Sequence, residues 1–243
     1  MIIVNEFVER LALDGFAVIP HCFEIEEVQE LAAALDHLDT ANSIRRGNQI
    51  YAIRNLLDVH PVVRELADSR KIRGLVEPVL GAHCFAVKAT LFDKRAEANW
   101  KVPFHQDLSI AVQEKMDAEG FGPWSQKMGV PNVQPPVRIL ERMLALRVHL
   151  DDCDESKGPL RVIPGSHLHG RLSDAKITEW KAARPSVCCA VPQGGILIMR
   201  PLLLHASSPA INPARRRIIH LEFAGERLPD GLQWHHKPMD SHN

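Results

Sequence analysis

MLALRVHL, residues 143–150, is the stretch of sequence that decides the fold. Its apolar positions follow the two-residue period of a β-strand, in which successive side chains point to opposite faces. One face is purely aliphatic and consists of Leu144, Leu146, Val148 and Leu150. The other face is mixed and consists of Met143, Ala145, Arg147 and His149, continued by Asp151. We expect the aliphatic face to pack under helices and the mixed face to line the interior of a β-barrel.

Other short apolar runs, bounded by Gly, Pro or Asp clusters, indicate further strands around this one. They are residues 83–92, 160–163, 187–191, 196–199 and 218–223. The part of the chain before residue 83 is expected to be mainly helical, because apolar residues recur at spacings of three and four over 25–38 and 72–80. A short strand is expected at 15–20 and a short helix at 174–183. Helices first and many strands later predict an α+β, mostly β protein, a β-barrel or jelly roll buttressed by N-terminal helices.

The length of 243 residues fits one large β domain. We therefore expect a single domain over residues 1–243, with a helical part at about 1–82, a β-barrel core at about 83–225 and a polar tail at 226–243. The Gly- and Pro-rich segment 115–136 interrupts the core. Long loops in compact domains usually serve as lids or binding loops, so this insertion is expected to be one.

The composition excludes several classes of function. The formal net charge is −1, so no strong field attracts nucleic acid or an anionic membrane. No apolar run reaches the roughly 18 residues of a transmembrane helix, and residues 1–6 lack the basic region of a signal peptide. The five cysteines are odd in number and widely spaced, which favours reduced thiols. We expect a cytoplasmic protein, monomer or homodimer, with a small-molecule substrate and no nucleic-acid or membrane partner.

A His-x-Asp pair suggests a metal site. In an extended backbone, residues two apart share a face, so His105 and Asp107 can present an imidazole nitrogen and a carboxylate oxygen to one point. A third ligand is needed, and His205 at the end of an apolar run offers one. Two histidines and one carboxylate form the facial triad of non-haem Fe(II) oxygenases, which leaves positions open for cosubstrate and O2. Taken alone, the pair has a simpler explanation as a surface histidine beside an aspartate.

Arg216, eleven residues after His205, strengthens the metal interpretation. A 2-oxoglutarate molecule chelates iron through its keto acid end, and its far carboxylate needs a fixed cation such as a bidentate arginine. Arg216 shares strand parity with His220 and is expected to face the barrel interior. Arg217 shares parity with Ile219 and should lie on the side of the apolar layer.

These motifs together resemble the phytanoyl-CoA dioxygenase family. The resemblance spans roughly residues 7–225 and rests on five segments: Asp14-Gly15-Phe16-Ala17-Val18, His105-Gln106-Asp107, GPLRVIPGSH at residues 158–167, His205-Ala206-Ser207, and Arg216. It implies a double-stranded β-helix, iron, and the oxidative decarboxylation of 2-oxoglutarate with O2. It also implies that Gln106 and Ser207 help to hold the cosubstrate and that His167 belongs to a structural turn. The related halogenases carry a small residue where this chain has Asp107, so hydroxylation is the expected reaction.

Several further residues are candidates for the lining of the site. Lys88 and Thr90 share one face of the strand at 83–92, and either could contact 2-oxoglutarate or substrate. Arg147 and His149 lie on the mixed face described above. A buried arginine needs a partner, so Arg147 binds either an anionic substrate group or Asp151 in a structural ion pair.

Aromatic and basic residues beside the metal strand are candidates for the substrate mouth. Trp100 and Lys101 directly precede that strand, and Trp124 lies in the insertion. Anchoring of loops by the two tryptophans is an equally valid explanation. His235 and His236 in the tail are expected to be solvated.

The sequence therefore predicts an Fe(II)- and 2-oxoglutarate-dependent dioxygenase that hydroxylates an unactivated C–H bond of a small metabolite and releases succinate and CO2. Catalysis depends on His105, Asp107 and His205. A non-catalytic jelly-roll binding protein and a cupin-like metal-dependent hydrolase or isomerase are the alternatives. The former does not explain an intact triad, and the latter gives no reason for Arg216.

Overall fold

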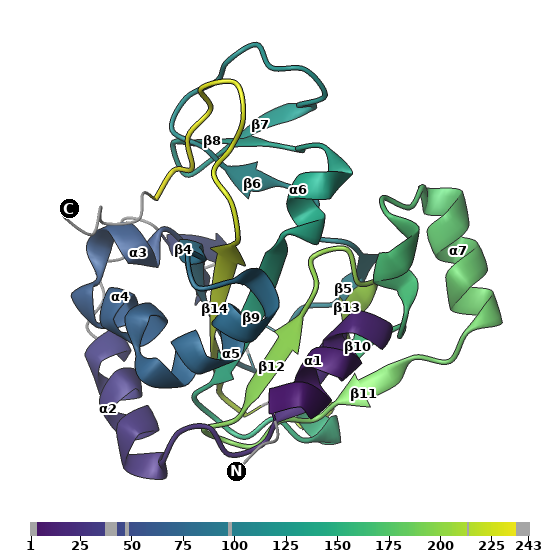
Figure 1. The fold of residues 1–243 in the computed structure, drawn as a ribbon. Helices are drawn as coiled ribbons and strands as arrows, with labels where there is room; N and C mark the ends of the chain where they lie inside the picture. Colours follow the sequence, from purple (N-terminus) through teal and green to yellow (C-terminus); the bar gives the residue numbers. More distant parts are fainter. Residues whose placement is uncertain (1–3, 37–42, 47–48, 97–98, 213, 237–243) are drawn as a thin grey trace.

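The structure is a computed structural model that describes residues 4–36, 43–46, 49–96, 99–212 and 214–236. Two antiparallel sheets face each other as a jelly roll (Figure 1). The larger sheet has the order β1-β12-β9-β14-β4-β3-β2. Its strands are β1 (Phe16–Ile19), β2 (Ser43–Arg46), β3 (Gln49–Ile53), β4 (Phe85–Lys94), β9 (Met143–His149), β12 (Ile196–Met199) and β14 (Arg216–Ala224).

Two smaller antiparallel sheets accompany the large sheet. One has the order β11-β10-β13-β5 and consists of β5 (Val102–His105), β10 (Leu160–Val162), β11 (Val187–Cys189) and β13 (His205–Ser207). A second, of order β6-β8-β7, consists of β6 (Ile110–Ala111), β7 (Trp124–Lys127) and β8 (Val130–Val133). The double-stranded β-helix implied by the resemblance is confirmed by this architecture.

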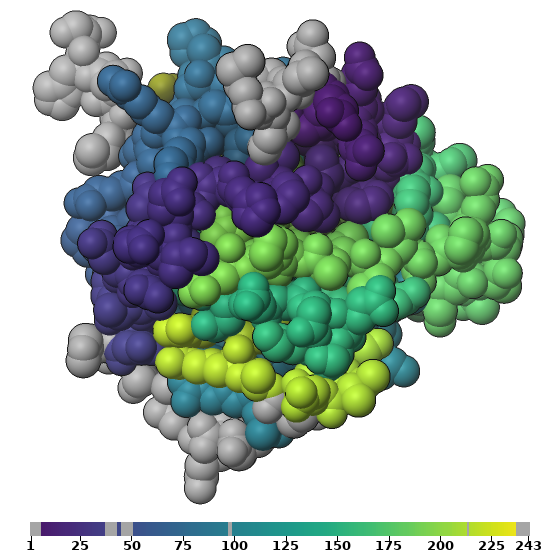
Figure 2. All heavy atoms as spheres, turned by 90° about the horizontal axis from the view of Figure 1, so that it is seen from below, coloured from purple at the N-terminus to yellow at the C-terminus, as the bar shows by residue number. Residues whose placement is uncertain are grey.

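Five N-terminal helices buttress the larger sheet. They are α1 (Val4–Leu13), α2 (Ile25–Asp36), α3 (Leu56–Val59), α4 (Pro61–Asp68) and α5 (Arg70–Leu80). Their apolar faces and the aliphatic face of β9 form one buried cluster, as expected. Seen from below, the N-terminal chain and the segments near residues 195, 150 and 220 lie side by side in successive bands (Figure 2). Later in the described part of the chain come the helices α6 (Val137–Glu141) and α7 (Asp174–Ala183) and the 3₁₀ turns Glu155–Lys157 and Ser166–His169.

The expectation of a mainly helical first third was wrong for residues 43–46 and 49–53. These residues form the paired strands β2 and β3, and β3 extends the large sheet by pairing Ala52 with Phe92 and Ile53 with Leu91. Pairing with an existing sheet overrides local helix propensity. The apolar stripe of α2 also begins later than expected, because Ile25 is 43% exposed. Leu38, its expected end, lies outside the described residues.

The insertion and the tail form a second packed unit. Residues 124–133 form the β7–β8 hairpin rather than an irregular loop. The tail is not polar as expected, since Leu228, Leu232 and Trp234 are buried in the cluster that includes Ile110 and Val133. Figure 1 shows this C-terminal segment beside β6 and β8 at one end of the jelly roll.

The histidines of the tail, expected to be solvated, are only partly exposed. His235 and His236 both contact the Asp58 carboxylate, at 2.7 and 3.3 Å. All five cysteines are free thiols. Among the residues that the structure describes, no helix is long and apolar enough to cross a membrane.

We predict that Trp234→Ala destabilises the protein substantially. The indole is 4% exposed and its Nε1 donates to the Glu226 carbonyl at 3.1 Å. Truncating a buried tryptophan to alanine typically costs about 3–5 kcal/mol. Chemical denaturation followed by fluorescence and circular dichroism measures the change. Ile211→Ala is the control, because Ile211 is 87% exposed and should change stability by less than about 0.5 kcal/mol. Equal stability of both variants would show that the tail is not part of the core.

Candidate metal centre

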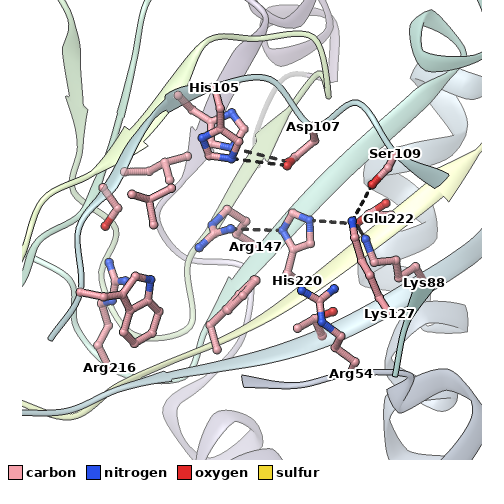
Figure 3. A pocket seen from close by; sticks show the side chains of 17 residues that line it. Arg54, Lys88, His105, Asp107, Ser109, Lys127, Arg147, Arg216, His220 and Glu222 are labelled. Atoms are coloured by element: carbon pink, nitrogen blue, oxygen red, sulfur yellow. Dashed lines mark hydrogen bonds and ion pairs between the residues drawn. The ribbon is translucent and has the colours of Figure 1, made fainter. Parts of the chain in front are cut away.

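A polar cavity of about 260 Å³ lies between the two facing sheets (Figure 3). Strands β4, β9 and β14 supply one wall, and β5, β10 and β13 supply the other. The cavity wall includes Thr90, Trp100, His105, Asp107, Arg147, His205, Ser207, Arg216 and His220. The mixed face of β9 therefore points into the barrel, as predicted.

His105, Asp107 and His205 converge at one side of this cavity. β13 pairs with β5 so that His205 lies directly opposite His105. The Asp107 carboxylate lies 3.7 Å from His105 Nε2 and 3.6 Å from His205 Nε2. One donor atom of each residue lies within 4.8 Å of the others. Ligands at right angles on one ion are about 3 Å apart for bonds of 2.0–2.2 Å, so small side-chain rotations suffice to bind a metal.

Both histidines are held in the tautomer that a metal requires. His105 Nδ1 lies 2.9 Å from the Pro103 carbonyl, and His205 Nδ1 lies 2.9 Å from the Leu203 carbonyl. A carbonyl only accepts, so each Nδ1 carries the proton and each Nε2 keeps its lone pair for a metal. Since the same contact recurs at both ligands, the chemistry of the donor set fits a divalent cation.

The protonation states of these groups also suit metal binding. Burial lowers the pKa of His205 to about 4 against the attraction of Asp107, so its imidazole is neutral at pH 7. Withdrawal from water would raise the pKa of Asp107, but electrostatic interactions with the neighbouring His205 and His220 side chains, and with Lys88, hold that pKa well below its usual range. Neutral imidazoles and an ionised carboxylate are the ligand forms that bind Fe(II).

The segments that carry the ligands are fixed by two polar side chains. Gln106 donates to the Leu202 and Gly170 carbonyls at 2.7 and 2.8 Å and accepts from the Leu172 amide at 2.8 Å. Ser166 accepts from the Leu204 amide at 2.8 Å, directly before His205. Gln106 is thus saturated by backbone groups outside the cavity, and its expected contact with the cosubstrate was wrong. It clamps the ligand-bearing segments instead.

The structural turn implied for His167 is present. His167 is buried, and its Nε2 lies 3.3 Å from the Ala12 carbonyl. A Cβ on Gly15, which has a φ of +84°, would lie 2.5 Å from its ring. The turn therefore joins the first helix to the smaller sheet.

Cations without anionic partners gather at the Arg216 end. Arg216 is 4% exposed, and its Nη1 donates to the Gly158 carbonyl at 2.5 Å. Its buried Nε has no hydrogen-bond partner. Lys94 Nζ donates only to the Ser208 carbonyl among the described residues, and burial with repulsion by Arg216 lowers the pKa of Lys94 to about 8. An orphaned guanidinium nitrogen in a buried cationic corner fits an anionic ligand.

The parity predicted for the three consecutive arginines is confirmed. Arg216 lines the cavity. Arg215 and Arg217 point away from it, Arg215 to Asp93 at 3.0 Å and Arg217 to Asp151 at 2.9 Å. The latter contact also removes the predicted alternative of an Arg147–Asp151 ion pair.

Arg147 instead belongs to a buried network of hydrogen bonds and ion pairs. Its Nη1 donates to His220 Nδ1 at 3.2 Å, which leaves His220 Nε2–H facing Glu222 at 3.4 Å (Figure 3). Lys88 Nζ contacts the same Glu222 carboxylate at 2.5 Å. The Arg147 guanidinium lies 5.4 Å from the Phe92 ring, and its Nε has no hydrogen-bond partner.

The remaining candidates divide into two groups. Lys88, Thr90, Trp100 and Ser207 line the cavity. Lys101 is exposed outside it, and Trp124 packs against the second hydrophobic cluster, so loop anchoring was the correct alternative there. His149 is 2% exposed and does not line the cavity. Burial, with Arg147 and Arg216 nearby, holds the pKa of His149 well below its usual range.

Sequence reasoning missed four polar residues of the cavity wall: Arg54, Ser109, Lys127 and Glu222. Glu222 shares parity with His220 and Arg216, and this signal could have identified it. Arg54 directly follows β3 in the connection to α3, and Lys127 ends β7 at the β7–β8 turn. No local pattern revealed the place of these segments in the fold.

The comparisons with known proteins agree with this geometry. A double-stranded β-helix with two histidines and one aspartate at its mouth is the framework of the non-haem Fe(II)- and 2-oxoglutarate-dependent oxygenases. The family described as phytanoyl-CoA dioxygenase (PhyH) matches residues 11–218. The chain therefore belongs to the phytanoyl-CoA dioxygenase family, and it is a non-haem Fe(II)- and 2-oxoglutarate-dependent dioxygenase.

Similar proteins include characterised hydroxylases. The ectoine dioxygenase of Stutzerimonas stutzeri (strain A1501) is 22% identical over 88% of this chain and 74% of its own length. The L-proline trans-4-hydroxylase of Streptomyces griseoviridis is 21% identical, over 88% and 84%. The structure of EctD from S. alaskensis with 2-oxoglutarate and 5-hydroxyectoine has a TM-score of 0.69 at 20% identity, covering 89% of this chain and 74% of that chain. AviO1 from Streptomyces viridochromogenes Tue57 has a TM-score of 0.68 at 22% identity, covering 95% and 98%.

We predict that Arg216→Ala weakens 2-oxoglutarate binding by well over tenfold. Loss of a charged partner from a buried carboxylate costs about 2–5 kcal/mol, and Arg216→Lys should recover only part of the loss because the two-pronged contact is gone. Calorimetric titration with 2-oxoglutarate under anaerobic conditions measures the change. Arg215→Ala and Arg217→Ala are the controls and should change affinity far less. A larger loss in Arg217→Ala than in Arg216→Ala would contradict the assignment.

Proposed function

We propose that this protein hydroxylates an unactivated C–H bond of a small-molecule metabolite, with Fe(II) held by His105, Asp107 and His205. The observation that carries this proposal is the pair of Nδ1-anchored histidines facing one aspartate inside a cavity that also contains a buried, incompletely bonded arginine. A binding protein without turnover or a metal-dependent hydrolase gains no support from any feature of this cavity.

Each residue has a role that follows from its contacts. The carbonyls of Pro103 and Leu203 orient the two imidazoles, and the ionised Asp107 supplies the one negative charge of the donor set. Arg216 binds the far carboxylate of 2-oxoglutarate through its free Nε and remaining N–H groups. Ser207 and Thr90, which line the same wall, provide hydroxyls beside it. Bound iron and 2-oxoglutarate with O2 supply the oxidising chemistry, with succinate and CO2 as coproducts.

The size of the cavity supports a small substrate. A volume of about 260 Å³ lies just below the range of roughly 300–1,000 Å³ typical of small-molecule sites, and it must also admit 2-oxoglutarate. It therefore has no room to enclose a long acyl chain. Trp100 and Arg147 line it and are proposed to contact the substrate. A cytoplasmic location, favoured by the free thiols, and a monomeric or homodimeric state complete this proposal.

The test is release of succinate from 2-oxoglutarate by purified protein with Fe(II), ascorbate and O2. Treatment with EDTA should abolish it, and added Fe(II) should restore it. Because Fe(II) lies early in the affinity order of divalent metals, Zn(II) should compete for the site without supporting turnover.

Asp107→Ala should lose succinate release while two histidines retain weak metal binding. Asp117→Ala, at an exposed position, is the matched control and should behave as wild type. Metal content by mass spectrometry separates loss of binding from loss of turnover. Full turnover in Asp107→Ala would show that this carboxylate is not a ligand.

A further inference from the structure

The end of the cavity away from Arg216 carries a second excess of positive charge. Arg54, Lys88 and Lys127 lie there beside the carboxylate of Glu222, and the other carboxylate of the cavity wall is that of Asp107, which belongs to the metal-binding set. Glu222 is already bonded to Lys88 at 2.5 Å and lies 3.4 Å from His220, so it is neutralised without the other two cations. Figure 3 shows these groups together on one side of the cavity, with Arg216 on the other.

Lys127 and Arg54 have little to bind within the protein. Lys127 Nζ donates to the Ser109 hydroxyl at 2.7 Å. No hydrogen bond or ion pair joins Arg54 to any other residue of the described chain. Burial lowers the pKa of Lys127, and repulsion by Lys88 and Arg54 lowers it further against the attraction of Glu222. Placing several cations side by side in a half-buried wall costs free energy through their mutual repulsion. An anionic ligand bound between them would offset this cost.

The cosubstrate cannot be that anion. Arg216 and Glu222 are six residues apart on β14, which corresponds to about 20 Å along a strand. A five-carbon diacid bound to Arg216 is too short to reach the second cluster. Figure 3 shows His105 and Asp107 between Arg216 and the second cluster, and Asp107 interacts electrostatically with Lys88 and Lys127. A molecule anchored at the second cluster would therefore extend towards the metal.

We propose that the substrate carries an oxyanion group, a carboxylate or a phosphate, which Lys127 and Arg54 bind at the end of the cavity opposite Arg216. This inference rests on the proposed function and specifies its substrate class. Arg54 supplies a planar fork and Lys127 a point charge, and both suit an oxyanion. The β3–α3 connection and the β7–β8 hairpin would thus select the substrate, while the two facing sheets hold metal and cosubstrate.

The test uses three probes of one shape: phenylacetate, phenyl phosphate and the neutral phenylacetamide. Each is titrated under anaerobic conditions into full-length protein saturated with Fe(II) and 2-oxoglutarate, so that Arg216 is already occupied. At least one oxyanion should bind about tenfold more tightly than the amide, as expected for a charge-assisted contact. The tighter of phenylacetate and phenyl phosphate identifies the group.

Substitutions of Lys127 and Arg54 test whether the oxyanion binds at the second cluster. Lys127→Met and Arg54→Gln should each weaken the oxyanion about tenfold without changing the affinity for the amide, and Lys127→Arg should restore most of the loss. Lys176→Met is the control, since Lys176 lies on the exposed surface of α7 beside Glu179, and it should bind the oxyanion as wild type does. Both test positions lie on the cavity wall, so thermal unfolding is measured to confirm that each variant is folded.

The outcomes separate this inference from the function on which it rests. If calorimetric titration shows that 2-oxoglutarate does not bind the wild-type protein loaded with Fe(II), the proposed function fails. If it binds but the oxyanions and the amide bind equally, or not at all, the oxyanion subsite is overturned and the proposed function stands. Oxyanion binding that is unchanged in both Lys127→Met and Arg54→Gln also overturns the subsite.

Discussion

The register between β9, β14 and β4 is the constraint on which both the core and the cavity depend. Ile219 of β14 lies opposite Val148 of β9 and Leu91 of β4, and this row packs under the helices. The next residue, His220, lies opposite Arg147 and faces the cavity. A slip of one residue would exchange the two faces and bury charged groups against the helices. Burial of the aliphatic side chains thus sets the register of these strands, and the register in turn turns the polar side chains towards the cavity.

The cavity that results contains buried cationic side chains whose charge and hydrogen-bonding groups are not fully paired within the protein. Arg215 and Arg217 find carboxylates outside the barrel, whereas Arg216 and Arg147 each keep a buried Nε without a partner. Such groups cost free energy until a ligand binds them. Binding of an anionic ligand to the folded state alone then stabilises that state. The unpaired cations that lower the stability of the protein without its cosubstrate therefore also contribute to its affinity for the cosubstrate.

Local pattern was enough for the parts of the site that lie on regular strands. The alternation in residues 143–150 predicted both faces of β9, and strand parity, the spacing from His205 and the family resemblance agreed on Arg216 among three neighbouring arginines. Other parts depend on contacts between residues distant in sequence. Gln106 adjoins two metal-binding residues yet bonds to Gly170, Leu172 and Leu202 instead. Neither the alternation nor the resemblance contains that information, so its role was assigned wrongly.

The positions of the missed residues follow a physical division of the fold. Metal and cosubstrate require ligands fixed to within fractions of an ångström, and strands locked into two sheets, clamped by Gln106 and Ser166, provide that rigidity. The second cationic cluster takes Lys127 from the β7–β8 hairpin and Arg54 from the segment that connects β3 to α3. Connecting segments of this kind can change length and sequence without shifting the register of β9 and β14. A chain built in this way can therefore change the molecule it accepts while keeping the chemistry it performs, because the two sets of side chains depend on different parts of the fold.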